Sequence, residues 1–274
     1  MRYSNQHLHA FPASPDGMAQ LPEMIEACAA AGLRIATFTD HMDMADEPTG
    51  RAKNTYPLRR RFFEERRALA EGLAPPELDV RFGMELGAAL QLPEEALAAA
   101  SMPGLDFIIA SVHNLPDVPD FHFYTFADEA ECEALNHRYL AELIKLADFP
   151  NFDVMGHIGY TSRYMKMQGF NGVLTLEKYG DELTTLLRRL IQNGKGIECN
   201  TSGYRSGGRG TFPSEEILRL YRSLGGEIIT VGSDGHKPSH AALGLREGFE
   251  LLKACSFRYV AEFRERKCTF TPLD

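Results

Sequence analysis

The sequence predicts a single-domain α/β protein folded as a distorted (β/α)7 barrel of the TIM type, and three observations support this prediction. Short apolar runs alternate with amphipathic segments of helical period along the chain. Polar residues able to bind metal ions follow nearly every apolar run. No linker rich in proline, glycine and serine divides the 274 residues. Such alternation implies parallel strands joined by crossover helices, and about seven of these units would close into a barrel.

The predicted strands and helices follow one another in a regular order. Strands are expected at residues 3–9, 34–38, 78–84, 106–110, 152–155, 196–199 and 227–231. Helices are expected between them, at residues 21–31, 58–71, 127–146, 176–192, 213–224 and 241–254. Ser214 is placed to cap the helix that begins at Glu215, and Gly194 and Gly225 are placed to end two helices. Residues 203–210 are interpreted as a loop within the repeat.

The charge and composition of the sequence limit the binding partners and the cellular location that we expect for the protein. The formal net charge of -9 argues against a nucleic acid as the main partner, although bound divalent cations would offset part of it. The N-terminus lacks the apolar core of a signal peptide, and no stretch approaches the roughly 20 apolar residues of a membrane span. We therefore expect a cytoplasmic protein with no membrane partner. The five scattered cysteines form no CxxC pair, so we expect reduced thiols and no thiolate zinc site.

Residues that can ligate metals gather where the predicted strands end. The carboxyl ends of parallel barrel strands lie on one face, so these residues would converge on one site. His7 and His9 are two residues apart, which places both side chains on the same side of a strand. Six of the nine histidines fall at strand ends, a concentration that the usual structural role of a lone histidine does not explain. The candidates are His7, His9, Asp40, His41, Glu85, His113, His157, Glu198, Asn200, Asp234 and His236.

The donor types indicate which metals and which chemistry to expect. Imidazole combined with carboxylate suits zinc, iron or manganese. The candidates outnumber the ligands of one tetrahedral ion, so at least two divalent ions bridged by a carboxylate are expected, and three would fit. A multinuclear cluster lowers the pKa of a bridging water and clamps a phosphoryl oxygen, which favours phosphoester hydrolysis over peptide or amide cleavage. His137 and His240 lie in or beside helical patterns and are interpreted as structural, and His122 in a loop stays unassigned.

Six short motifs resemble, in their order, those of the polymerase and histidinol phosphatase (PHP) superfamily. They are His7-Leu8-His9, Thr39-Asp40-His41, Gly83-Met84-Glu85, Ser111-Val112-His113, Gly156-His157 and Ser233-Asp234-Gly235-His236. Residues 156–164, 197–205 and 225–234 are most similar to the histidinol-phosphatase branch. The resemblance spans nearly the whole chain and implies one metallophosphoesterase domain over residues 1–274. It also implies hydrolysis of L-histidinol phosphate, a small phosphorylated metabolite of histidine biosynthesis.

The resemblance implies a site with three divalent metal ions and two phosphate-binding arginines. The implied ligands are His7, His9, Glu85 and Asp234 for the first metal, Glu85, His113 and His157 for the second, and Asp16, His41 and His236 for the third. Glu85 would bridge the first two metals. Arg163 and Arg205 would act as catalytic residues that grip the phosphate and stabilise the charge of the transition state. A metal-bridging hydroxide would attack phosphorus in line, so no covalent phosphoenzyme is expected.

The chain departs from the family pattern in two places. The family usually has an aspartate two residues before the first histidine, where this chain has Asn5. An aspartate there would orient a ligand histidine, so we expect altered metal affinity but not loss of the site. The loop at residues 114–126 is particular to this chain, so its substrate contacts do not follow from the resemblance.

Three alternative functions stay open on the sequence alone. The nearest is a phosphatase that acts on another small phosphomonoester, such as a sugar or nucleotide phosphate. A nuclease or polymerase-associated proofreading module would fit the superfamily, but the acidic charge and the lack of an attached domain count against it. A non-catalytic metal-binding or regulatory protein is favoured only by Asn5, and the presence of both arginines and the principal ligands opposes it.

Overall fold

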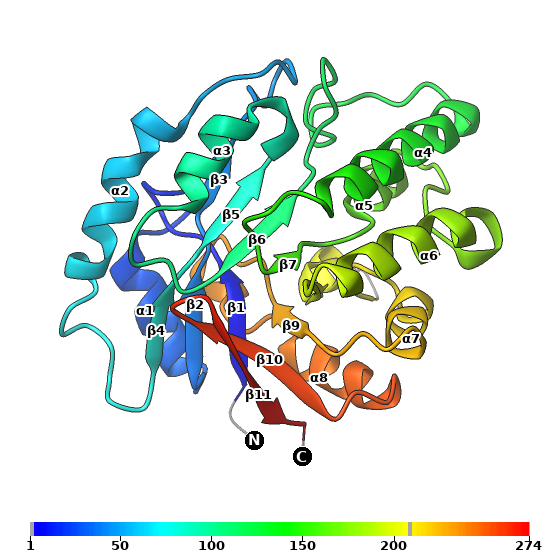
Figure 1. Ribbon diagram of the computed structural model, residues 1–274. Coiled ribbons are helices and arrows are strands. Elements are labelled where there is room, and N and C mark those ends of the chain that lie inside the picture. The colour runs from blue at the N-terminus through cyan, green and yellow to red at the C-terminus, as the bar shows by residue number, and fades with distance from the viewer. Residues whose placement is uncertain (1–2, 208–209, 274) are drawn as a thin grey trace.

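The computed structural model describes residues 3–207 and 210–273 and shows a parallel barrel (Figure 1). Its parallel strands form one sheet of three, in the order β1-β2-β4, and one sheet of six, in the order β3-β5-β6-β7-β8-β9. Since β3 continues β2 and β5 continues β4, there are seven strand positions, and a predicted strand falls on each. The strands are β1 (Ser4–Leu8), β2 (Ile35–Phe38), β3 (His41–Asp43), β4 (Asp79–Phe82), β5 (Met84–Gly87), β6 (Ile108–Ser111), β7 (Val154–Met155), β8 (Gly196–Asn200) and β9 (Ile229–Gly232). The predicted barrel is confirmed.

Two strand positions are broken by a bend. Phe38 ends β2, and Gly83 separates β4 from β5. A Cβ at Gly83 would lie 2.3 Å from the carbonyl oxygen of Phe107, so only glycine permits this approach. The guanidinium of Arg66 donates to the carbonyl oxygens of both Phe38 and Gly83 and so ties the two bends together. The sequence prediction, which ran one strand through Gly83, missed this break.

The barrel closes where the chain after β1 meets the chain after β9. Leu8 and Gly235 form a parallel bridge. The amide of His9 donates to the carbonyl oxygen of Gly235 over 2.9 Å, and the amide of Gly235 donates to the carbonyl oxygen of His7 over 3.3 Å. This seam brings together strand ends that lie at opposite ends of the sequence.

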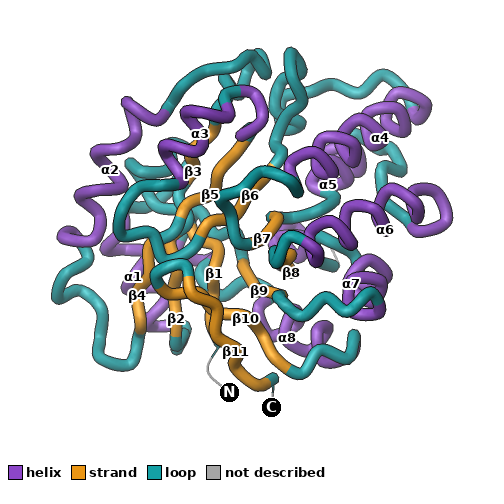
Figure 2. Tube along the Cα trace, viewed as in Figure 1, coloured by secondary structure: helices purple, strands orange, loops and turns teal. Residues whose placement is uncertain are grey.

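Helices surround the strands, as Figures 1 and 2 show. They are α1 (Leu21–Ala30), α2 (Tyr56–Leu69), α3 (Pro93–Ala100), α4 (Glu129–Leu146), α5 (Tyr160–Met167), α6 (Leu176–Gln192), α7 (Glu215–Ser223) and α8 (Leu245–Ala254), with short 3-10 segments η1 (Ala89–Gln91), η2 (Thr201–Gly207) and η3 (Pro238–His240). Every predicted helix is present, whereas α3 and α5 were not predicted. Gly194 and Gly225 follow their helices at φ of 68° and 92°, as expected. Ser214 is the N-cap residue of α7, but its side chain makes no capping hydrogen bond. Residues 203–207, expected in a loop, belong to η2, and residues 208 and 209 lie outside the described residues.

A C-terminal hairpin that the sequence prediction missed closes the amino end of the barrel. It pairs β10 (Tyr259–Arg264) with β11 (Lys267–Pro272) in antiparallel register. Ala261 and Phe263 pack against Phe107 and Ile109 of the barrel. The side chain of Gln6 donates to the carbonyl oxygen of Ala261 over 2.6 Å and accepts from the amide of Phe263 over 3.2 Å. The strand ends at the opposite, carboxyl end are left available for a site.

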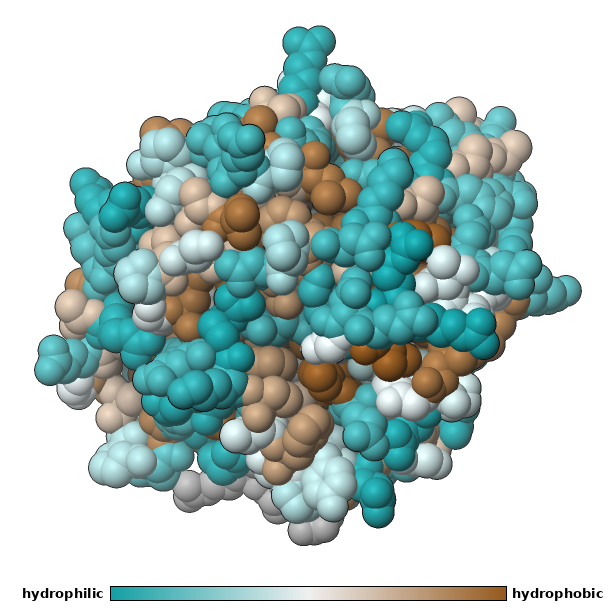
Figure 3. Space-filling view, in the orientation of Figure 1, coloured by the Kyte–Doolittle hydropathy of each residue, from teal (hydrophilic) through white to brown (hydrophobic). Residues whose placement is uncertain are grey.

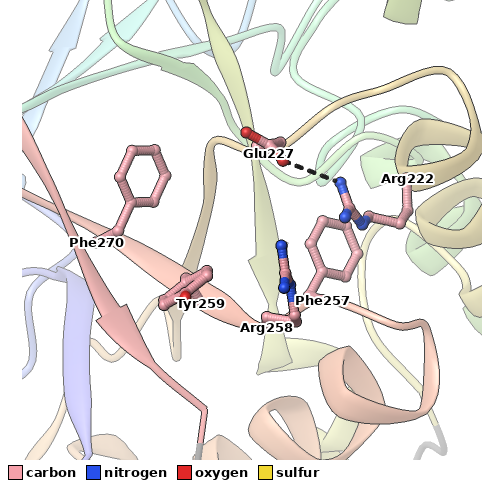
Figure 4. A pocket seen from close by; sticks show the side chains of 6 residues that line it. All are labelled: Arg222, Glu227, Phe257, Arg258, Tyr259 and Phe270. Carbon is pink, nitrogen blue, oxygen red and sulfur yellow. Dashed lines mark hydrogen bonds and ion pairs between the residues drawn. The ribbon is translucent and has the colours of Figure 1, made fainter.

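A hollow lies on the outer surface beside this hairpin. A cavity of about 290 Å³ lies beside it (Figure 4), lined by Arg222, Glu227, Phe257, Arg258, Tyr259 and Phe270. None of the predicted ligands lines this cavity. On the face drawn in Figure 3, hydrophobic residues are interspersed with hydrophilic ones. Within the described part of the chain, no helix is long and apolar enough to cross a membrane.

Candidate metal centre

The predicted ligands converge at the carboxyl end of the barrel, around Glu85 of β5. This carboxylate is only 1% exposed. Its Oε1 lies 2.7 Å from Nε2 of His157 and 3.1 Å from Nε2 of His113. Its Oε2 lies 3.2 Å from Nε2 of His7 and 3.1 Å from Nδ1 of His41. One carboxylate therefore faces two groups of imidazoles, one on each oxygen.

A second set of contacts surrounds Asp16 and Asp234. Asp16 Oδ2 lies 2.8 Å from Nε2 of His236 and 3.5 Å from Nε2 of His41. Asp234 Oδ1 lies 3.5 Å from Nε2 of His9. The ring of His9 stacks between those of His41 and His236, with centroid distances of 4.3 and 4.1 Å. The structure thus brings together the nine ligands that the resemblance implies, including Asp16 from the loop after β1.

The donor atoms fit metal ions. Among the residues that the structure describes, three groups have donor atoms within 4.8 Å of one another, namely His7 with His9 and Glu85, His41 with Glu85 and His113, and His9 with His41 and His236. Several buried atoms of these groups have no hydrogen-bond partner, namely Nε2 of His7, Nε2 of His9, Nδ1 of His41 and Oε2 of Glu85. Buried polar atoms without partners cost free energy, and here they share one location. Imidazole and carboxylate donors in this arrangement suit divalent cations.

Burial and charge have opposite effects on the pKa values of the clustered side chains. Burial alone would lower the pKa of His7, but the carboxylates of Glu198 and Glu85 outweigh it and raise this pKa well above its ordinary value of 6.5. Burial and the neighbouring imidazoles lower the pKa of His9. Burial would raise the pKa of Glu85, yet the charges of the surrounding imidazoles lower it. Protons therefore stabilise the carboxylates where divalent cations would do so in the metal-bound protein.

Three ligand histidines are oriented by neighbouring polar groups. Among the candidate ligands, Glu198 and Asp40 lie behind these histidines, and Asn200 donates to Glu198. Nδ1 of His7 lies 2.7 Å from Oε1 of Glu198, and Nδ1 of His113 lies 2.9 Å from Oδ1 of Asp43. Nδ1 of His9 lies 3.0 Å from the hydroxyl of Ser14, which donates in turn to Asp40, the partner of Arg66. Contacts at Nδ1 leave Nε2 as the donor for a metal. Two features of the sequence could have pointed to these orienting groups. Glu198 lies at the end of a predicted strand, and Asp43 lies two residues after His41.

Asn5 has a different role from the one inferred from the family pattern. Its Oδ1 accepts from the backbone amides of His7 and Ser233, each over 3.1 Å. Its Nδ2 donates over 2.7 Å to Oγ of Ser233 and over 2.7 Å to the carbonyl oxygen of Ala241. The acceptor for the ring of His7 is Glu198, so Asn5 does not take the orienting role expected of an aspartate at this position. Asn5 instead joins β1 to the chain after β9.

Asn5→Asp is expected to destabilise the protein without improving the metal site. A carboxylate cannot donate to Ala241 and would face its carbonyl oxygen, at a cost of about 2–4 kcal/mol. Urea denaturation measures this loss, and metal analysis of the folded protein should show unchanged content. Asn54→Asp is the control, because this exposed side chain only accepts, from the amide of Tyr56. Unchanged stability of Asn5→Asp would contradict the assigned role.

The two predicted arginines lie beside the cluster. Nη2 of Arg163, in α5, is 3.8 Å from Oδ2 of Asp234, and Nη2 of Arg205, in η2, is 3.6 Å from Oδ1. Arg205 also donates to the carbonyl oxygen of Ser233 over 3.1 Å. Burial would raise the pKa of Asp234, but Arg205 and the nearby histidines lower it well below its usual range. The rim of the cluster is therefore cationic where an anionic substrate would enter.

The histidines outside the cluster have other surroundings. Nδ1 of His137 lies 2.9 Å from Oε1 of Glu182 and links α4 to α6, which supports its structural interpretation. His122 is exposed in the loop before α4, with its ring centroid 5.6 Å from that of Tyr164. His240 is half-buried in η3, and burial lowers its pKa to about 4.

A parallel barrel whose strand ends gather histidine and carboxylate donors, with arginines beside them, defines a metal-dependent hydrolase. Residues 5–202 match the family model of the PHP domain, which is more than half of the chain. The chain therefore belongs to the PHP domain family, as its sequence motifs indicated.

Curated relatives and a solved structure extend this match. A protein of Lactococcus lactis subsp. lactis (strain IL1403) named histidinol-phosphatase is 27% identical over 97% of this chain and 96% of its own. A protein of Thermotoga maritima named "probable histidinol-phosphatase" is 25% identical over 94% of each chain. The crystal structure of the Lactococcus lactis histidinol phosphate phosphatase with zinc, L-histidinol and phosphate matches with a TM-score of 0.78 and 23% identity, covering 98% of this chain and 99% of that one. This likeness confirms the barrel fold.

Proposed function

We propose that this protein is a metal-dependent histidinol-phosphate phosphatase, which hydrolyses L-histidinol phosphate to L-histidinol and phosphate in histidine biosynthesis. The observation that carries the proposal is the convergence of the metal-binding side chains and both arginines at one end of the barrel. The relatives with this name match nearly the whole chain, and the solved one holds zinc, histidinol and phosphate. We also propose that residues 1–274 form one domain and that the protein acts in the cytoplasm.

Three divalent ions are part of the proposal, with zinc as the first choice and iron or manganese also suited to these donors. The ions would be held by His7, His9, Glu85 and Asp234 for the first, by Glu85, His113 and His157 for the second, and by Asp16, His41 and His236 for the third. Glu85 is suited to bridging because each of its oxygens faces a different group of imidazoles. When bound, such ions would activate a water molecule and neutralise charge on the phosphate.

Arg163 and Arg205 bind the substrate phosphate in this proposal. A guanidinium offers parallel N–H donors that match phosphate oxygens. Nε of Arg205 is buried and has no hydrogen-bond partner, so this donor is available to a ligand. The side chains position the phosphate and stabilise its charge, and no serine, cysteine or aspartate nucleophile is required.

Arg205→Met is expected to lower kcat/KM for a phosphomonoester about 100-fold, because a charge-assisted contact to the phosphate is lost. Steady-state kinetics of the zinc-loaded protein measures this loss. Arg219→Met is the control, since Arg219 is an exposed residue of α7 that pairs with Glu215. A kcat/KM of Arg205→Met equal to that of the control would remove Arg205 from the site.

A panel of phosphomonoesters tests the substrate. Zinc-, iron- and manganese-loaded protein is given histidinol phosphate, glucose 6-phosphate, AMP and p-nitrophenyl phosphate, and released phosphate is measured. The proposal expects kcat/KM for histidinol phosphate to exceed the others by about 100-fold or more. A higher value for another ester would make the protein a phosphatase of that ester. No phosphate release with any metal would reject phosphatase activity.

A further inference from the structure

A chain of hydrogen bonds leads from Arg163 through the end of β8 to His7. Nη2 of Arg163 donates to Oγ of Ser202, and this hydroxyl donates to Oδ1 of Asn200. Nδ2 of Asn200 donates over 3.0 Å to Oε2 of Glu198. Oε1 of Glu198 lies 2.7 Å from Nδ1 of His7. Every donor in this series of hydrogen bonds has an acceptor. Glu198 contacts Asn200 through one carboxylate oxygen and His7 through the other, so it connects the arginine side of the series to the histidine side.

This chain is built into the barrel. Glu198 and Ser202 are each 1% exposed, and Asn200 is 0% exposed. Glu198 and Asn200 are two residues apart in β8, so their side chains share one side of the strand. A Cβ at Gly232 of the neighbouring strand would lie 2.4 Å from Oε1 of Glu198, so glycine there leaves room for the carboxylate. The backbone amide of His157 also donates to Oε2 of Glu198, over 3.0 Å.

The end of β8 also positions Arg163 through a second route. The guanidinium carbon of Arg163 lies 5.1 Å from the ring centroid of Phe212, 5.6 Å from that of Tyr160 and 5.8 Å from that of Tyr164. Phe212 is fixed to β8, because its amide and that of Asn200 each donate to the other's carbonyl oxygen over 2.9 Å. Aromatic faces thus limit the position of the guanidinium while Ser202 holds one of its nitrogens.

We propose that Ser202, anchored by Asn200 and Glu198, is a positioning residue that holds Arg163 toward the metal centre in the orientation that binds phosphate. This inference rests on the phosphate-binding role proposed for Arg163. An arginine that rotates freely loses conformational entropy whenever it binds, whereas a tethered arginine binds phosphate at a lower cost. Since Glu198 also orients His7, one carboxylate supports both the phosphate-binding and the metal-binding sides of the site.

A double-mutant cycle tests the positioning role. The dissociation constant of inorganic phosphate is measured by calorimetry on the zinc-loaded protein, together with zinc content per chain. Ser202→Ala is expected to weaken phosphate binding roughly tenfold with zinc content unchanged, the effect of one lost hydrogen bond to a charged group. In the Arg163→Met background the same substitution should have no further effect, because Ser202 then has nothing to position. Ser202→Thr, which keeps the hydroxyl, should restore binding to within about twofold of the original protein.

The matched control is Ser162→Ala. Ser162 is a buried neighbour of Arg163 in α5, but its hydroxyl donates to the carbonyl oxygen of Gly172. This variant should bind phosphate as the original protein does. If Ser202→Ala does not fold, Ser202→Cys replaces it in the double-mutant cycle, because a thiol is a poor hydrogen-bond partner.

Three results would overturn the inference. They are unchanged phosphate affinity in Ser202→Ala, an equal loss in the Arg163→Met background, and a loss of zinc that accounts for the weaker binding. Phosphate binding does not depend on which ester is the substrate. Failure to hydrolyse histidinol phosphate would therefore reject the proposed substrate while leaving this cycle interpretable.

Discussion

Glu85→Gln is expected to lower the rate of phosphomonoester hydrolysis by about a thousandfold or more and to lower the bound metal per chain. The carboxylate contacts five imidazoles, and both of its oxygens face the cluster. An amide keeps the shape but removes the negative charge, and its NH2 group cannot ligate a cation. Two of the three proposed metals would lose a shared ligand at once.

Metal analysis and kinetics with saturating zinc distinguish this outcome from general damage. The matched control is Glu262→Gln, because Glu262 is a buried carboxylate in β10 that pairs with Arg34 at the other end of the barrel. That variant is expected to lose stability but to keep its metal content and its activity per folded molecule. Full metal content and activity in Glu85→Gln would remove Glu85 from the centre of the site.

Chelation is expected to reverse the way in which stability depends on pH. In the metal-free protein the pKa values of His7, His41 and His113 are raised because, despite burial, carboxylates surround them. Such groups stabilise the fold fully below their unfolded pKa of about 6.5, and this contribution is lost as pH rises through the folded values. The pKa values of Glu85 and Asp234 are lowered, so their contribution is present above about pH 4 and is lost as pH falls. The metal-free protein should therefore be most stable between about pH 4.5 and 6.5.

Above this pH range, zinc should stabilise the protein more strongly as pH rises, whereas the chelated protein loses stability. A metal needs neutral imidazoles, so protons compete with it less as pH rises. Between pH 6 and 8.5, the difference in melting temperature between zinc-loaded and chelated protein should grow by about 5–15 °C. Thermal melts followed by circular dichroism measure this difference. If both forms shifted in parallel across this range, proton and metal would not compete for the same groups.

The order of strands and the gathering of ligands could be predicted from sequence, because both depend on a local pattern. Apolar runs alternate with helical periods, and parallel strands place their carboxyl ends on one face. Any donor that follows such a run is therefore carried to the same end of the barrel, however far away it lies in the chain. His7, Glu85 and Asp234 could be located in this way without any knowledge of their contacts.

What could not be predicted depends on partners distant in sequence. The break at Gly83 follows from a close approach to Phe107. The C-terminal hairpin depends on side chains that pack against the amino end of the barrel. The two missed helices, α3 and α5, have eight residues each, too few to show a clear apolar stripe. The role of Asn5 depends on Ser233 and Ala241, which no local pattern connects to it.

The seam between the chain after β1 and the chain after β9 bears on the stage of folding at which a complete set of metal ligands is present. It joins residues as far apart as Asn5 and Ser233, which are 228 positions apart, so it contributes to a high contact order. Ligands from β1 and from the chain after β9 meet only once this seam is made, and a partly folded barrel offers an incomplete set. We therefore expect bound metal to slow unfolding and to leave the rate of folding nearly unchanged. On this expectation, metal ions would stabilise the completed barrel without starting its folding.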